Sequence, residues 1–357
     1  MEKLLAPVLA FFLALLITPA VRKLAFAWGA VDLPNPRKVH QHVMPRLGGL
    51  AIYVAFVIPL FLTMPVSLFI GLITGISLIV LIGVIDDIKG ISPWLKLGGQ
   101  ILAAYSLIML NIQIGFVTNP FNGHIIPLGW WGIPITIFWV VAVTNAVNLI
   151  DGLDGLAGGV SCIAALTIAA VGWTQWKIFG ITGQQEIIML ALILAAAIIG
   201  FLWHNVYPAS IFLGDTGSML LGFSLAAVSV LGLTKSAAAV SIFIPLVILG
   251  IPLFDVVLAV FRRYHLHKPI FQADREHIHH QLMNLGLNQR QTVAVICGIS
   301  FILGISAVVL NIVTSDQAMI LLVILAGLGI ILAGKIGLFS VSKRTSRTAS
   351  RNSSQHL

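Results

Sequence analysis

The sequence is poor in charge and in cysteine, and both shortages exclude classes of protein. Only 9% of its 357 residues are charged, whereas about a quarter are charged in an ordinary soluble domain. The two cysteines, Cys162 and Cys297, both fall inside apolar runs, which favours core packing over a disulfide. No basic soluble segment accompanies the net charge of +8, so nucleic acid is not an expected partner.

The sequence contains long hydrophobic runs instead, and hydrophobic residues make up 59% of it. A helix that crosses a bilayer needs about 17 to 25 apolar residues. Eleven runs meet this length: 4–21, 47–64, 66–85, 94–111, 133–150, 156–176, 187–203, 217–233, 237–261, 291–311 and 317–334. None alternates with the period of two that a closed barrel needs. We therefore predict an all-α integral membrane protein with about eleven transmembrane helices.

The basic residues are distributed unevenly over the predicted loops. Of the 20 Lys and Arg, all but Lys3, Lys177 and Lys235 lie on one side of the predicted spans. The positive-inside rule puts that side in the cytoplasm, so the N-terminus is expected outside and the C-terminus inside. Residues 1–340 are expected to form one membrane domain, and residues 341–357 a disordered basic tail.

The longest predicted outer loop, residues 112–132, contains several prolines and glycines and ends in Trp130-Trp131. This composition is typical of a turn-rich excursion that interfacial aromatic residues close. We predict a small hairpin there with a structural role, because the loop has almost no ionisable groups.

The 12 acidic residues gather on the predicted cytoplasmic side. The exceptions are Glu2, Glu186 and Asp316. A carboxylate at the centre of a membrane helix costs roughly 2.5 to 3.5 kcal/mol, so such residues tend to be retained for function or pairing. Neither Arg nor Lys is near Asp151, Asp154 or Asp215 in sequence. A divalent cation is an alternative partner, and carboxylates with water and substrate phosphate suit Mg²⁺.

Two of these acids belong to the stretch NAVNLIDGLDG, residues 145–155. If a helix continues through it, Asn148, Asp151 and Asp154 share one broad face. The glycines beside them let backbone approach a ligand closely. The alternative is a polar helix end that simply faces water.

The stretch GDTGS, residues 214–218, precedes the eighth apolar run. Its glycines favour a tight turn, and Asp215 and Thr216 can cap the helix that follows. The free N–H groups of the first turn favour an anionic ligand. An ordinary helix cap explains the same residues without a ligand.

Two cytoplasmic loops combine histidine with basic residues: RKVHQHVMPRLGG at 37–49 and DREHIHH at 274–280. Cations beside histidines favour a phosphate or diphosphate guest, and a transition-metal site is the alternative for the second loop. The positive-inside rule alone explains much of the first loop, and the remainder suits a lipid phosphate.

Four stretches now occur in one order along the predicted spans: DDIK (86–89), NAVNLIDGLDGLAGG (145–159), NVYPASIFLGDTGS (205–218) and HIHH (277–280). Together they resemble the polyprenyl-phosphate N-acetylhexosamine-1-phosphate transferases, glycosyltransferase family 4. The resemblance covers about residues 15–310. The loop at 37–49 and the His-Ile-His-His form are similar to the branch that loads N-acetylglucosamine-1-phosphate, especially its teichoic-acid-initiating members.

The resemblance implies an enzyme of the bacterial cell membrane whose active site faces the cytoplasm. Such enzymes move a sugar phosphate from a UDP-sugar to undecaprenyl phosphate and release UMP. UDP-GlcNAc is the expected donor, and Mg²⁺ is the expected cofactor, with Mn²⁺ as a substitute. Phospho-N-acetylmuramoyl-pentapeptide transfer is the alternative within the family. A cation transporter is the alternative outside it, although its acids should lie near mid-membrane. Gly-rich spans also allow a homodimer.

Carried over position by position, the resemblance assigns roles to individual residues. Asp86, Asp87 and Asp215 become the active-site acids and metal ligands, with Asp215 the strongest candidate ligand. The expected substrate-binding residues are Asn148, Asp151, Asp154, Asn205, His277, His279, His280, Arg37, Lys38, His40, Arg46 and Lys89.

Two chemical routes are open for such a transfer. Either the lipid phosphate attacks the sugar-bearing phosphorus directly, or an aspartate attacks first and forms a phospho-enzyme. A phosphate monoester has a second pKa of about 6, so the lipid phosphate is largely dianionic at neutral pH without a strong base. We therefore hypothesise direct attack, with Asp86 and Asp87 positioning metal and acceptor.

Overall fold

The structure, a computed structural model, describes residues 2–33, 43–65, 69–119, 124–233, 243–265 and 277–336. Its helices are α1 (Glu2–Ala27), α2 (Gly48–Thr63), α3 (Ile70–Lys89), α4 (Pro93–Met109), α5 (Gly132–Ile150), α6 (Leu156–Lys177), α7 (Gln184–Asn205), α8 (Gly214–Leu233), α9 (Phe243–Ile248), α10 (Gly250–His265), α11 (Ile278–Asn284), α12 (Gln289–Leu310) and α13 (Ser315–Ile336). The other elements are β1 (Val31–Asp32), β2 (Met44–Pro45), β3 (Phe116–Thr118), β4 (Ile125–Pro127) and the 3₁₀ turn η2 (Gly129–Trp131).

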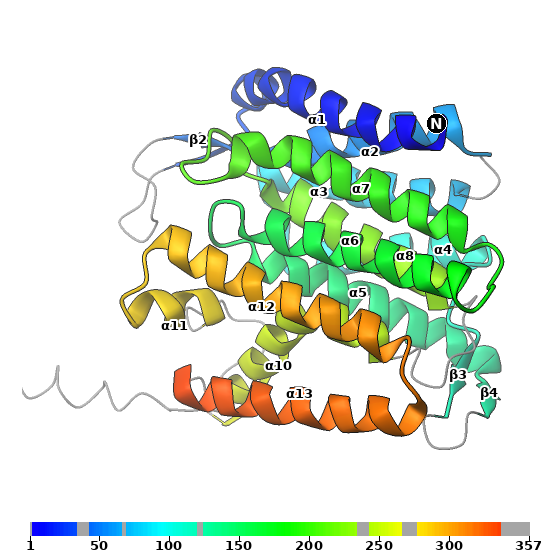
Figure 1. The fold of residues 1–357 in the computed structure, drawn as a ribbon. Helices are drawn as coiled ribbons and strands as arrows, with labels where there is room; N and C mark the ends of the chain where they lie inside the picture. The colour runs from blue at the N-terminus through cyan, green and yellow to red at the C-terminus, as the bar shows by residue number, and fades with distance from the viewer. Residues whose placement is uncertain are drawn as a thin grey trace, which may run out of the picture.

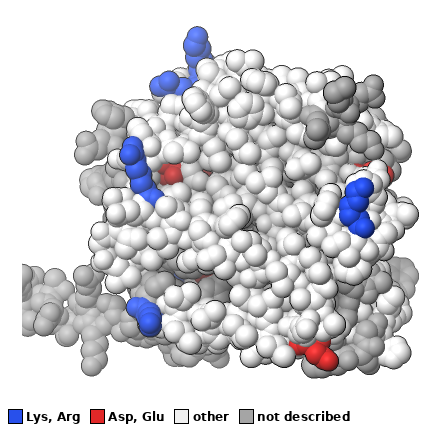
Figure 2. Space-filling view, viewed as in Figure 1, with Lys and Arg blue, Asp and Glu red and all other residues white. Residues whose placement is uncertain are grey.

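The described part of the chain is an all-α integral membrane protein, as predicted. Within it, eight helices are long and apolar enough to cross a membrane: α1, α3, α5, α6, α7, α8, α12 and α13. The apolar helix α2 is shorter, at 16 residues. The main helices run side by side in one bundle (Figure 1). A broad face of the bundle is almost free of charged side chains, which gather near its edges (Figure 2), as expected where lipid covers the surface.

The prediction of one continuous helix over residues 237–261 is wrong. The described part of this run forms α9 and α10, which are separated at Leu249. Pro252 has no N–H to donate to the preceding turn, and Gly250 lowers the helix propensity at the same point. The run is apolar throughout, so hydropathy alone did not reveal the break.

Helix α8 is the centre of the bundle and packs against α2, α3, α5, α6 and α7. Of the residues in its apolar window, 83% are buried, compared with 11% for α13. Small residues let its first turns approach their neighbours. A methyl group on Gly49 of α2 would collide with the backbone of Gly217, and one on Gly83 of α3 would collide with that of Thr216. The start of α8 is thereby held between α2 and α3.

The hairpin predicted within residues 112–132 is present. Strands β3 and β4 pair antiparallel, with Phe116 opposite Pro127 and Thr118 opposite Ile125. A second small pair, β1 and β2, lies near the other end of the bundle (Figure 1). Pro45, at the end of β2, accepts a 2.8 Å hydrogen bond from the N–H of Phe212. This contact brings Arg46 beside the loop that leads into α8.

Candidate active site

The acid pair Asp86-Asp87 lies in the last turn of α3, where both side chains are buried. Gly90 ends the helix with φ +67°, a conformation that glycine adopts without strain. The chain then turns back, so that the N–H of Ile91 donates a 2.8 Å hydrogen bond to Oδ1 of Asp86. The second oxygen of Asp86 faces the ammonium group of Lys96. Asp86 is therefore fully engaged by the start of the next helix.

Asp87 caps a helix that begins far along the chain. Its carboxylate accepts hydrogen bonds from the N–H of Asp215 at 3.0 Å, the N–H of Thr216 at 2.9 Å and the Thr216 hydroxyl at 2.6 Å. Our expectation that Asp215 and Thr216 cap their own helix is wrong, because Asp87 supplies the acceptor. The expectation that these N–H groups are free for an anionic ligand fails for the same reason.

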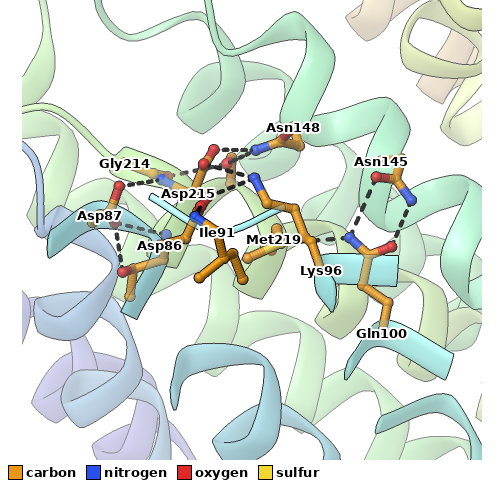
Figure 3. A network of polar contacts seen from close by, with 12 residues as sticks. Asp86, Asp87, Ile91, Lys96, Gln100, Asn145, Asn148, Gly214, Asp215 and Met219 are labelled. Carbon is orange, nitrogen blue, oxygen red and sulfur yellow. Dashed lines mark hydrogen bonds and ion pairs between the residues drawn. The ribbon is translucent and has the colours of Figure 1, made fainter. Parts of the chain in front are cut away.

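Lys96 is a site residue that the sequence analysis missed. It lies in the first turn of α4, and its Nζ contacts Asp86 and lies 2.8 Å from Oδ2 of Asp215 (Figure 3). One lysine therefore joins carboxylates from α3 and α8. The position of Lys96 in the sequence was a signal for this role. A cation in the first turn of a helix interacts unfavourably with the helix dipole, so a nearby anion is expected to compensate it. Lys89, which was predicted instead, is exposed in the last turn of α3.

Asp215 also receives a neutral donor from α5. Asn148 Nδ2 lies 2.7 Å from Asp215 Oδ1 and 2.7 Å from the hydroxyl of Ser218. About one turn deeper, the same three helices meet again. Gln100 of α4 and Asn145 of α5 exchange two amide hydrogen bonds, and Gln100 also reaches the sulfur of Met219 in α8 (Figure 3). These contacts fix how far α4, α5 and α8 are shifted along one another, and therefore where their polar groups lie at the site.

The second acid pair lies on a turn, so the predicted continuous helical face is wrong. Helix α5 ends at Ile150, Asp151 is its C-cap, and Gly155 with φ +76° precedes α6. Helix-disfavouring glycines at 152 and 155 account for the interruption. Asp154 lies within this turn, and its Oδ2 accepts a 3.0 Å hydrogen bond from the N–H of Ala209.

Asp151 lies in a part of the site that has excess negative charge. Burial, followed by the carboxylates of Asp215, Asp87 and Asp154, raises its pKa to about 8. Its own residue is partly exposed on the surface of the turn. The environment therefore disfavours a fourth negative charge unless a cation accompanies it.

Asn205, at the end of α7, ties two loops together. Its Oδ1 accepts from the N–H of Gly155 at 3.1 Å, and its Nδ2 donates to the carbonyl of Ile211 at 2.9 Å. Arg46 approaches from the β2 side, where its guanidinium donates to the backbone carbonyl of Asp87 at 3.0 Å and lies 3.7 Å from that residue's carboxylate. Both residues hold backbone in place beside the acids.

The histidine motif starts at α11. His277 precedes the helix, His279 is buried, and His280 is partly exposed. Burial, together with the neighbouring His280 and His277 rings and against the opposing effect of Asp255, lowers the pKa of His279 to about 4. His279 is therefore a neutral ring at pH 7. It lies so close to Gly152 that an alanine there would put its methyl group 2.5 Å from Nε2.

These residues surround a cleft of about 330 Å³. The predicted residues that line it are Arg46, Asp87, Asn148, Asp151, Asp154, Asn205, Asp215 and His280. Tyr207 and Gln289 also line it and were not predicted. His279 contacts the lining residue His280, and Asp86 is joined to the lining residue Asp215 through Lys96. Arg37, Lys38, His40 and the tail from 341 lie outside the described residues.

The acids gather at helix ends and not at mid-membrane. Asp86 and Asp87 end α3, Asp151 caps α5, and Asp215 is in the first turn of α8. A transporter of the kind considered above would hold its carboxylates half-way along discontinuous helices. The observed arrangement suits a site that opens at one end of the bundle.

The carboxylates of the site differ in how well they suit Mg²⁺. Among the residues that the structure describes, no three His, Cys, Asp or Glu side chains form a ready-made metal group. Mg²⁺ usually binds one or two carboxylates and completes its shell with water and substrate phosphates. Asp215, whose side chain is 33% exposed, and Asp151 both line the cleft. They fit an ion that arrives with a diphosphate, and Asp87 fits less well, because its side chain is only 1% exposed.

The chain is similar in sequence to known proteins. Residues 69–233 match the family described as Glycosyl transferase family 4. Over 330 residues the chain is 40% identical to the probable undecaprenyl-phosphate N-acetylglucosaminyl 1-phosphate transferase of Bacillus subtilis (strain 168), covering 91% of this chain and 90% of that protein.

Two further relatives are more distant. The decaprenyl-phosphate N-acetylglucosaminephosphotransferase of Mycobacterium tuberculosis (strain ATCC 25618 / H37Rv) is 32% identical, covering 78% of this chain and 75% of that protein. The undecaprenyl-phosphate alpha-N-acetylglucosaminyl 1-phosphate transferase of Escherichia coli (strain K12) is 31% identical, covering 77% and 75% respectively.

Proposed function

Because the chain belongs to glycosyl transferase family 4, we propose that it transfers N-acetylglucosamine-1-phosphate from UDP-GlcNAc to undecaprenyl phosphate and releases UMP. The similarity to the Bacillus subtilis protein over 91% of this chain supports the acceptor lipid and the sugar. The product, undecaprenyl-diphospho-GlcNAc, would begin a cell-surface glycan such as teichoic acid.

The observation that carries the proposal is the convergence on one cleft of Arg46 and four aspartates, with Lys96 paired to one of them, Asp215. The four aspartates are Asp87, Asp151, Asp154 and Asp215. Phosphoryl transfer depends mainly on positioning and on neutralising charge. Lys96 lies between Asp86 and Asp215, so its ammonium group is held in place before any ligand arrives. A site with this excess of carboxylates can accept a diphosphate only together with additional positive charge.

We propose Mg²⁺ as the source of that charge, held by Asp215 with Asp151 as the second carboxylate. When bound, it would supply positive charge that neutralises the diphosphate. The protein's own contribution is to orient these carboxylates. Asn148 fixes one oxygen of Asp215 and Lys96 fixes the other, which limits rotation of the side chain. Asp87 acts one step further away, because it holds the helix turn that carries Asp215.

Direct attack by the lipid phosphate is the route that we favour. A nucleophilic aspartate needs an oxygen that can reach phosphorus, and the side chains of Asp86 and Asp87 are only 7% and 1% exposed. Asp86 binds Ile91 N–H and Lys96, and Asp87 binds the first N–H groups of α8. The dianionic acceptor requires no strong base at neutral pH. We assign these two carboxylates to positioning the site and the acceptor.

We also propose that the cleft faces the cytoplasm. The support is the uneven distribution of Lys and Arg, of which all but Lys3, Lys177 and Lys235 belong to the side that carries the acid-bearing helix ends. A cysteine introduced at exposed Lys89, at the end of α3, can be probed with a membrane-impermeant thiol reagent in right-side-out vesicles. Labelling only after the membrane is opened is the expected result. Labelling of intact vesicles would contradict the orientation.

The decisive assay is UMP release by purified protein with Mg²⁺ and undecaprenyl phosphate. UDP-GlcNAc should support release, and UDP-MurNAc-pentapeptide should not. Release only with the pentapeptide donor would move the protein to the other branch of the family. Absence of UMP with either donor would refute the proposed function. Direct attack is tested by omitting the lipid, because phospho-aspartate formed from UDP-GlcNAc alone would exclude it.

A further inference from the structure

Asp255 is a buried acid outside the cleft that the proposed function does not use. It lies on α10, its residue is 1% exposed, and it does not line the cleft. Both carboxylate oxygens are engaged at short distance by the segment that begins α11. Oδ2 lies 2.7 Å from Nδ1 of His277, and Oδ1 accepts the N–H of Ile278 at 2.9 Å. One side chain from α10 thus fixes two consecutive residues.

This contact also sets the state of the histidine ring. An ionised carboxylate only accepts hydrogen bonds, so Nδ1 of His277 must carry the hydrogen. His277 occupies the N-cap position of α11, but its side chain makes no capping bond, and Asp255 accepts the N–H of Ile278 instead. Helix α11 has only 7 residues. A helix this short is not stable by itself, so tertiary contacts such as this one determine where it lies.

A chain of ring contacts leads from Asp255 to the cleft. The His277 and His279 rings are parallel within 4°, with centroids 6.0 Å apart. His279 and His280 follow at 4.2 Å. His280 lines the cleft, and Nε2 of His279 lies against Gly152, next to Asp151. A displacement of His277 would therefore move the rings that form this wall.

We propose that Asp255 is a positioning residue for the nucleotide sugar. Through His277 it holds α11 so that His279 and His280 form one wall of the cleft beside the turn at residues 151–155. This inference rests on the proposed function, since it names the donor substrate of the same cleft. Asp255 acts on the donor through the histidines and does not touch it.

The substitution Asp255→Asn tests the proposal with little change in side-chain volume. An amide offers one acceptor oxygen and one donor nitrogen, so it cannot accept from both His277 and Ile278. If its oxygen keeps the Ile278 bond, its NH₂ group faces Nδ1 of His277 and favours hydrogen on Nε2 instead. We expect KM for UDP-GlcNAc to rise roughly tenfold, since a charge-assisted hydrogen bond is lost. KM for undecaprenyl phosphate should stay within twofold.

Ring protonation gives a second readout that does not depend on turnover. In protein labelled with ¹⁵N-histidine, the His277 resonances should show hydrogen on Nδ1 in the wild type and on Nε2 in Asp255→Asn. Asp255→Glu restores a carboxylate and should recover part of the affinity for UDP-GlcNAc. The ring resonances confirm that the contact has changed, and a residue needed only for folding would not raise one KM selectively.

Asn311→Ala is the matched control at the opposite end of α6. Asn311 is buried and joins α12 to α6 through two hydrogen bonds, at 2.6 Å to Thr174 and 3.0 Å from Gln175. Its loss should lower thermal stability and leave KM for UDP-GlcNAc unchanged.

The possible results separate this inference from the proposed function. Wild-type protein that releases no UMP refutes the function, and with it the donor named here. Wild-type activity together with an unchanged KM in Asp255→Asn refutes the positioning role alone. A loss of stability like that of Asn311→Ala without a selective rise in KM also overturns it.

Discussion

The Nζ of Lys96 lies 2.8 Å from Oδ2 of Asp215, a residue 119 positions later in the chain. The same ammonium group contacts Asp86, so it separates two carboxylates that would otherwise repel each other. Two carboxylates that share one cation in this way depend on it for their geometry.

Replacement of Lys96 should therefore be severe. Lys96→Met keeps the length of the side chain and removes the charge, which leaves Asp86 and Asp215 without their shared partner. We expect the rate of UMP release to fall at least about hundredfold, with Lys96→Arg retaining more activity than Lys96→Met. Lys335→Met, on exposed α13, is the control and should retain normal activity. Equal rates in Lys96→Met and wild type would exclude the role of this lysine.

Asp215→Asn should abolish turnover and weaken the dependence on Mg²⁺, because it removes a partly exposed carboxylate of the proposed ion site. The measurement is UMP release as a function of Mg²⁺ concentration. Asp316→Asn, an exposed acid in the first turn of α13, should give the wild-type curve. Similar losses in both variants would contradict a site at one end of the bundle.

Asp87→Ala should lower stability as well as activity. It removes the acceptor for two backbone N–H groups and one hydroxyl at the start of α8. Leaving such buried donors unpaired costs roughly 2 to 4 kcal/mol. Thr216→Val removes one of the three donors and should cost about 1 kcal/mol.

Thermal unfolding in detergent, followed by a dye that reacts with Cys162 and Cys297 as they become exposed, measures these changes. Asp316→Asn again serves as the reference. An inactive Asp87→Ala protein with wild-type stability would mean that Asp87 acts in the chemistry and not as a cap.

His279 predicts a loss of stability in acid. Its pKa is about 4 in the folded protein, compared with an ordinary value of 6.5. Between pH 4 and 6.5, His279 binds a proton in the unfolded chain but not in the folded protein. Its contribution to the free energy of unfolding is therefore complete above pH 6.5 and declines as the pH falls towards 4. Over this pH range the free energy of unfolding falls by roughly 3 kcal/mol. In His279→Phe, the melting temperature should depend less on pH over this interval. An unchanged pH dependence would show that His279 is not the group responsible.

The fold was largely predictable because hydropathy is a local property. Each of the eleven apolar runs contains helix, and the outer hairpin formed where prolines and glycines interrupt the runs. The convergence of the acids at one end also followed from topology, since Asp86, Asp151 and Asp215 all lie at helix ends.

The partners of these acids were not predictable, because they depend on contacts between distant segments. Lys96 is separated from Asp215 by 119 residues, and Asp87 from Thr216 by 129. Periodicity cannot rank such pairs. The turn at Asp151 had a local signal in Gly152 and Gly155, but a helical spacing of the polar residues was equally consistent with that stretch.

The bond between Asp87 and the start of α8 has a consequence for the synthesis of the protein. Asp86 and Asp87 are made and inserted with α3, long before residues 215 and 216 exist. During that interval the two acids have no α8 to hold, although Arg46 is already present and Lys96 follows nine to ten residues later. The site is therefore completed only after five further helices, α4 to α8, have been made.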